Sequence, residues 1–389
     1  MHRQVLLLAT AQALFQTVSV LVMTVGGLAG SRIATEPQLA TAPIAAMFLG
    51  TAIATFPASM WMARAGRRVG FIAGAMLGMI GGLVGAFGIV SQSLPILCLG
   101  TLLVGVYQGF AQFYRFAAAE VADDTFRPRA ISLVLAGGIV AALLGPALGC
   151  LGGPLLVPEY TGSFLLLAAA SLVAAGLLLG VRVPQPSVPA GGTAGRALMQ
   201  IVRQPTYLVA LFGAATGYGI MILAMTATPL AMVQHDHGLS ETAFVIQLHV
   251  LGMFLPSFFT GSLIARFGVL RVMLTGVALF AGHVLMSLSG TGFSSFASAL
   301  VLLGVGWNFL YVGGTTLLTG TYTASERGRA QAANDMTIFT VGLASSLGAG
   351  MLQQAIGWQA MNMLLLPWLA LAALAIVWLV RHRAATAPA

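Results

Sequence analysis

The amino-acid sequence predicts an all-α integral membrane protein, with twelve transmembrane helices arranged as six plus six. Only 7% of the 389 residues are charged and 58% are hydrophobic, whereas a soluble domain carries about 25% charged residues. Apolar segments recur along the whole chain, and about 20 apolar residues cross the hydrocarbon core as a helix. Their continuous apolar character favours helices over a barrel, whose strands would alternate. This composition excludes a soluble enzyme, a disordered scaffold and a secreted disulfide-bonded module.

Twelve segments have the length and hydropathy of membrane spans. They cover residues 5–29, 41–62, 70–90, 95–119, 129–150, 162–181, 205–232, 241–264, 271–290, 294–320, 329–352 and 359–380. The first could be mistaken for a signal peptide, but eleven further spans follow it, which favours a retained first helix.

The basic residues indicate how the chain crosses the membrane. All 17 are arginines. With the N-terminus in the cytoplasm, 15 of them fall at cytoplasmic helix ends and loops; Arg32 lies outside, and Arg115 lies near the end of the fourth span. This asymmetry predicts a multi-pass protein with both termini cytoplasmic. The arginines are dispersed between apolar runs, so the net charge of +8 predicts lipid bilayer rather than nucleic acid as the partner.

The chain divides into two similar halves. We expect an N-terminal six-helix bundle at 1–181, a Pro- and Gly-rich cytoplasmic linker at 182–204 and a C-terminal six-helix bundle at 205–389. A short basic loop follows the second helix of each half, at 64–68 and 266–271. Such an internal duplication is typical of alternating-access transporters, in which two bundles rock about a central site.

Soft metal ligands occur at helical spacing on the seventh and eighth spans. Met221 and Met225 are four residues apart, as are His249 and Met253, so each pair shares a helix face. Counting from the outer helix ends places all four about 10–18 Å deep. Three thioethers and one imidazole would suit Cu(I) better than Mg, Ca or Mn. The other interpretation is that these methionines fill gaps between helices.

The whole chain resembles the major facilitator superfamily. The resemblance rests on the six-plus-six layout and on the basic loop between the second and third helices, Arg64-Ala65-Gly66-Arg67-Arg68-Val69-Gly70. The acidic residue of the family's signature is missing from this loop, which leaves the gating ion pair of that motif without its acid.

Within this superfamily, the Met-x-x-x-Met and His-x-x-x-Met pairs resemble those of the CcoA-like transporters. The resemblance implies that Met221, Met225, His249 and Met253 bind copper. It further implies a monomeric secondary transporter that imports copper across the bacterial inner membrane for assembly of cbb3-type cytochrome oxidase. Copper would be the transported substrate, with no cofactor and no enzymatic activity.

Two alternatives to copper import remain open. A related branch of the same group imports riboflavin, so an importer of a small organic solute such as riboflavin is one of them. The other alternative is a membrane copper receptor that does not transport its ligand.

A polar loop between the seventh and eighth spans is a candidate metal entry point. His235, Asp236 and His237 follow one another there, and imidazole and carboxylate groups could capture metal at the outer mouth. A solvated loop that precedes the eighth helix is the other interpretation.

Charged residues near the cytoplasmic helix ends are candidates for gating or proton coupling. These are Arg115, Glu120 and Asp335. Alternatively, Arg115 pairs with Glu120 at the membrane interface, and Asp335 is stabilised by its helix N-terminus and by Arg327 or Arg329. Amide side chains within the spans either line a cavity or bond between helices: Gln12, Gln16, Gln108, Gln112, Gln247 and Asn308.

Overall fold

A computed structural model describes residues 2–122, 130, 133, 134, 136–183, 196–323 and 326–386. Every regular element within these residues is a helix. Eleven of the described helices are long and apolar enough to cross a membrane, and one bent pair of helices supplies a twelfth span. The predicted all-α fold with twelve spans is confirmed.

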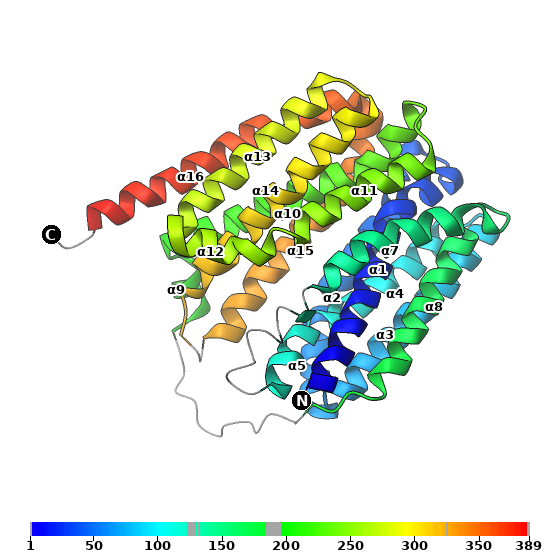
Figure 1. Cartoon of the computed structure of the whole chain (residues 1–389), viewed down its shortest axis with the longest axis horizontal. Coiled ribbons are helices and arrows are strands. Elements are labelled where there is room, and N and C mark those ends of the chain that lie inside the picture. The colour runs from blue at the N-terminus through cyan, green and yellow to red at the C-terminus, as the bar shows by residue number, and fades with distance from the viewer. Residues whose placement is uncertain are drawn as a thin grey trace.

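The two halves of the chain form two helical bundles that lie side by side (Figure 1). The first half contains α1 (His2–Ile33), η1 (Pro37–Leu39), α2 (Ala42–Ala65), α3 (Arg67–Val90), α4 (Leu94–Ala111), α5 (Tyr114–Val121), α7 (Gly137–Gly152), η2 (Gly153–Leu155) and α8 (Thr161–Leu178). The second half contains α9 (Leu198–Val202), α10 (Pro205–Gln234), α11 (Leu239–Phe254), α12 (Ser257–Phe267), α13 (Val269–Ser289), α14 (Phe293–Thr319), α15 (Arg327–Met363) and α16 (Leu365–Thr386).

Two spans that the sequence predicted as continuous are broken, so the prediction was wrong in this detail. The fourth span divides into α4 and α5 around Gln112 and Phe113. The eighth divides into α11 and α12, which meet at an angle of 41°. Pro256 lies at this second break. Proline has no amide hydrogen and its ring crowds the preceding turn, so it interrupts the helical hydrogen bonds there.

The boundary between the eleventh and twelfth spans lies at Gly357, inside the element α15. Its φ of 78° and ψ of 175° are not helical. Glycine has no Cβ and therefore adopts this conformation at little cost. The predicted loop at 353–358 contains this residue.

Most of the linker between the halves falls outside the described residues, since 184–195 are not among them. The division at 182–204 therefore stays a prediction. The residue that follows, Arg196, is bound to the second half. Its guanidinium donates two hydrogen bonds of 2.8 and 2.7 Å to the Glu326 carboxylate. These bonds hold the pKa of Glu326 below its usual range.

The bundles meet mainly along three pairs of long helices: α7 with α11, α2 with α15, and α1 with α10. At the end opposite the arginine-rich loops, the Thr41 hydroxyl of the first half donates a buried hydrogen bond of 2.8 Å to the Ser346 carbonyl of the second. Gly350 lies one turn further along α15, and a Cβ added there would be 2.6 Å from Thr41 Oγ1 and 2.9 Å from the Gln38 carbonyl oxygen. The lack of a side chain at Gly350 permits this close approach of the two halves.

We expect Gly350→Ala to force the halves apart at this end, which the arginine distribution assigns to the outside. Overpacking costs about 1–3 kcal/mol, so the outward-open fraction should rise about fivefold or more. The measurement uses the substitution Ser19→Cys, at a position that lines a cavity between the two halves. An impermeant maleimide is added to intact cells, and the extent of labelling is compared. Cys98 and Cys150 are first replaced by serine. Gly348→Ala is the control, because a Cβ there meets no described atom within 4 Å. Equal labelling of the two variants would refute the role of Gly350.

Candidate functional site: a cavity between the two halves

A cavity of about 370 Å³ lies between the two bundles and is lined by residues of both. This volume is within the roughly 300–1,000 Å³ typical of small-molecule sites. The lining extends from Met23 and Met225, which lie beyond the midpoints of α1 and α10, to Arg115 and Thr316, toward the arginine-rich end. The halves are in contact at the other end, so the cavity lies toward the arginine-rich end, which the arginine distribution predicts to be cytoplasmic.

The second half contributes an aromatic wall to this cavity, made of Tyr218, Trp307, Tyr311 and Phe339. The rings of Trp307 and Tyr311 stack, with centroids 4.9 Å apart and planes 11° apart. Tyr218 lies 6.1 Å from Tyr311, and Phe339 meets Tyr218 edge-on at 6.0 Å. Trp307 and Tyr311 are one helical turn apart on α14, while Tyr218 comes from α10. Stacked and edge-on packing fixes these rings as a rigid surface.

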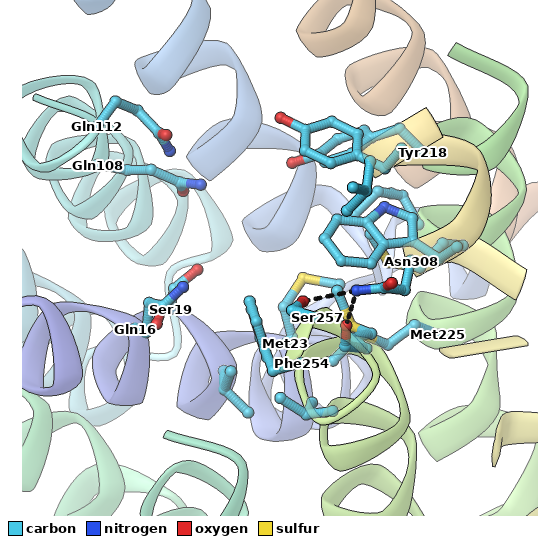
Figure 2. A pocket seen from close by; sticks show the side chains of 18 of the residues that line it. Gln16, Ser19, Met23, Gln108, Gln112, Tyr218, Met225, Phe254, Ser257 and Asn308 are labelled. Atoms are coloured by element: carbon cyan, nitrogen blue, oxygen red, sulfur yellow. Dashed lines mark hydrogen bonds between the residues drawn. The ribbon is translucent and has the colours of Figure 1, made fainter. Parts of the chain in front are cut away.

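The first half contributes four glutamines: Gln12 and Gln16 from α1, and Gln108 and Gln112 from the end of α4. Figure 2 shows the amides of Gln16, Gln108 and Gln112 on the side of the cavity opposite Tyr218. We call these four residues the glutamine face. The Oε1 atoms of Gln16 and Gln108 are buried and have no hydrogen-bond partner among the described residues. The amides were expected either to line a cavity or to bond between helices, and these four line the cavity.

The other two amides do not share this role. The Gln247 side chain bonds between the halves, donating to the Leu143 carbonyl at 3.0 Å. Asn308 reaches the cavity and also bonds between helices.

Three of the four predicted metal ligands line this cavity: Met221, Met225 and Met253. His249 is fully buried and is not among the lining residues. Its Nδ1 lies 2.8 Å from the Leu300 carbonyl of α14, and its Nε2 has no partner in the described part of the chain. The carbonyl fixes the proton on Nδ1, which leaves Nε2 as an acceptor or ligand. The structure thus places the three methionines on one cavity and turns the imidazole toward α14.

The predicted entry loop has most of its ring nitrogens engaged. His237 Nδ1 lies 2.8 Å from Glu241, and its Nε2 lies 2.8 Å from the Thr291 carbonyl. The Thr291 carbonyl and then the Glu241 carboxylate raise the pKa of His237 above its usual value. His235 Nδ1 lies 2.8 Å from the Ala231 carbonyl, and Asp236 has a φ of 64°. Metal capture by these residues stays a prediction. Within the described ranges, no group of three or more His, Cys, Asp or Glu is placed to hold a metal.

The three candidates for gating or coupling do not form one cluster. Glu120 binds Arg67 of the basic loop, at 3.0 Å to Nε and 2.5 Å to Nη2. Glu120 therefore pairs with Arg67 instead of the expected Arg115. The basic loop, whose own sequence lacks the acidic residue of the family signature, thus has an acidic partner from α5. Arg115 lines the cavity and interacts electrostatically with Asp335 of the other half. Gating by Arg115 and Asp335 stays a prediction.

Comparison with known proteins supports the transporter architecture. The sequence pattern of the Major Facilitator Superfamily matches residues 5–255 and 210–389, which together cover nearly the whole chain. The chain belongs to the major facilitator superfamily. It is thus a membrane transporter and not an enzyme.

Curated members of the superfamily resemble this transporter along most of their length. The riboflavin transporter RfnT of Brucella anthropi is 38% identical over 392 residues, covering 100% of this chain and 98% of the relative. Two uncharacterized transporters of Bacillus subtilis are also similar. YddS is 30% identical over 85% of this chain and 80% of its own length, and YdeG is 28% identical over 88% and 84%. The superfamily resemblance is confirmed, while a place among the CcoA-like copper importers is not.

Asn308 holds the broken eighth span of this transporter against α14. Its Nδ2 donates to the Met253 carbonyl and to Ser257 Oγ, both at 2.7 Å (Figure 2), and its Oδ1 accepts from Thr260 Oγ1 at 2.6 Å. These bonds join residues on both sides of Pro256. The position of Met253 and Ser257 on the cavity wall therefore depends on one buried amide.

We expect Asn308→Leu to destabilise the transporter. Three interhelical bonds at about 0.6 kcal/mol each amount to about 2 kcal/mol in a membrane protein. The measurement is thermal unfolding of purified protein in detergent. Thr316→Val is the matched control on α14, because the exposed Thr316 hydroxyl bonds only its own helix, at Val312. An unfolding midpoint of Asn308→Leu that equals that of the control would show that the Asn308 bonds do not stabilise the fold.

Proposed function

We propose that this transporter carries riboflavin, or a solute with the same three-ring isoalloxazine system, through the central cavity. The proposal is supported by the full-length likeness to the riboflavin transporter RfnT and by the chemistry of the cavity. The observation that carries it structurally is the aromatic wall facing the glutamine face across one cavity.

The cavity chemistry matches a planar, polar and uncharged solute. Aromatic side chains bind flat rings by stacking, with about 1–3 kcal/mol per stacked base in nucleic-acid complexes. Amide side chains both donate and accept, as the carbonyl, imide and ribityl hydroxyl groups of riboflavin require. Among the lining residues only Arg115 is charged, and the others are apolar, aromatic, amide or hydroxyl residues. A lining with so few charged groups suits an uncharged solute.

Copper is the second candidate substrate. The observation that favours it is that the Met221, Met225 and Met253 thioethers share the cavity, while His249 Nε2 is buried without a partner among the described residues. Thioethers and imidazole are suitable ligands for Cu(I). The likeness to RfnT favours riboflavin over copper, and methionines also line apolar cavities as adaptable packing groups.

Uptake of both substrates by the same variants separates the two functions. In cells that have no riboflavin importer of their own, we expect the transporter to accumulate radiolabelled riboflavin. Tyr311→Leu should reduce this uptake about fivefold or more, because a stacking ring is lost. Met221→Leu, Met225→Leu and Met253→Leu conserve volume, and each should keep uptake within about twofold.

Copper accumulation, measured as total cellular metal, is the second readout. We expect copper accumulation to match that of cells without the transporter.

Phe259→Leu is the control for the aromatic substitution Tyr311→Leu, because Phe259 is on α12 with its ring exposed on the outer surface of the bundle. Copper would become the proposed substrate under two conditions. The cells take up no riboflavin, and a Met→Leu change lowers copper accumulation at least about tenfold. Neither substrate accumulating would contradict both.

A further inference from the structure

We propose that the two halves recognise different parts of the substrate, and that the glutamine face selects it by the imide edge of its pyrimidinedione ring. This inference rests on the proposed riboflavin function and adds which atoms of the ring system the transporter reads. The aromatic wall of the second half holds the flat ring system, and Gln108 of the first half bonds the edge that contains N3–H and its flanking carbonyls.

The aromatic wall favours a flat ring over a chain. The stacked rings of Trp307 and Tyr311 are parallel to within 11°, and both residues line the cavity. Phe254 closes on Trp307 at 6.1 Å from the eighth span, with the planes 67° apart. Trp307 is only 7% exposed, and its Nε1 has no hydrogen-bond partner among the described residues.

The glutamine face of the first half contains buried amide oxygens that lack a hydrogen-bond donor among the described residues. Gln108 is 8% exposed and its Oε1 has no described partner. A buried amide oxygen without a partner costs about 1–3 kcal/mol. Because Gln108 lines the cavity, a rotation of its side chain that brings this oxygen to a ligand donor would remove that cost. Gln16 Oε1 is in the same situation on α1. A carboxamide has an acceptor beside a donor, which pairs with an imide N–H beside a carbonyl.

Division of the site between the halves has a consequence for selectivity. The N3–H of the isoalloxazine is the donor on its polar edge, whereas the ribityl chain is attached to N10 of the central ring, away from N3. A solute that retains the edge but lacks the ribityl hydroxyls should still bind. One that retains the ribityl chain but carries a methyl group on N3 should not, because its methyl leaves the Gln108 oxygen unpaired and crowds it.

Competition for uptake of radiolabelled riboflavin tests this selectivity on the wild-type transporter in cells. Lumiflavin, which has a methyl group in place of the ribityl chain, should inhibit uptake at concentrations similar to those of unlabelled riboflavin. N3-methylriboflavin should need at least about tenfold higher concentrations, because a site built to bond an N–H rejects the analogue that lacks it.

A substitution assigns the selectivity to a residue. Gln108→Met keeps the length of the side chain and removes its amide, so it should reduce riboflavin uptake and bring N3-methylriboflavin to within about twofold of riboflavin as an inhibitor. Gln359→Met is the matched control, because the exposed Gln359 lies outside the cavity lining and its one described bond, to Leu288, is 3.5 Å long.

The outcomes separate this inference from the proposed function. Riboflavin uptake with equal inhibition by riboflavin and N3-methylriboflavin would overturn edge recognition and leave the function in place. Selectivity that persists unchanged in Gln108→Met would overturn the role of Gln108. No riboflavin uptake by the wild type would overturn the function itself. The wild-type competition decides the inference even if Gln108→Met fails to fold.

Discussion

A polar group inside a membrane must find a partner in the protein or face a cavity that water or substrate enters. Buried polar side chains of two kinds lie on the cavity wall of the transporter. Asn308 of α14 bonds its amide donor and its amide acceptor to residues of the eighth span. Gln16, Gln108 and Trp307 each retain an atom without a described partner, and all three line the cavity. Unsatisfied groups also occur away from the cavity, as at His249 Nε2, so these three are candidates for substrate contact because they line the cavity as well.

The walls are held within each half by helices in backbone contact. A Cβ on Gly105 of α4 would lie 1.9 Å from the Met47 carbonyl oxygen of α2, and one on Gly304 of α14 would lie 2.4 Å from the His249 carbonyl oxygen of α11. Small residues at helix crossings give such close packing in membranes. Gly304 is one turn before Asn308, so the same contact that joins α14 to α11 brings Asn308 to the Met253 carbonyl. Rigid halves with a cavity between them are what alternating access requires.

The sequence predicted the membrane location, the number of spans and the superfamily, because apolar length and arginine position depend only on local composition. It did not predict the bend at Pro256 or the break after α4, although Pro256 was visible, because a hydropathy window averages over both. The glutamines were identified as cavity candidates with an equal alternative. Their role depends on which helices surround them, and a single sequence does not contain that information.

The substrate was harder to predict than the fold. Met221, Met225 and Met253 do reach one cavity, as their helical spacing indicated, but a thioether lines an apolar wall as readily as it binds a soft metal. The aromatic wall was also present in the sequence, with Trp307 and Tyr311 one turn apart. Its meaning became clear only when Tyr218, 89 positions before Trp307 in the chain, was found beside it.

The central claim is that the wall built on Trp307 binds an isoalloxazine ring. Titration of riboflavin with purified transporter tests it most directly, since stacking on an aromatic side chain quenches flavin fluorescence. We expect saturable quenching that weakens about tenfold in Trp307→Leu and is unchanged in Trp378→Leu, whose indole is on α16 and half exposed. Quenching of equal strength in the wild type and in both variants would contradict the account.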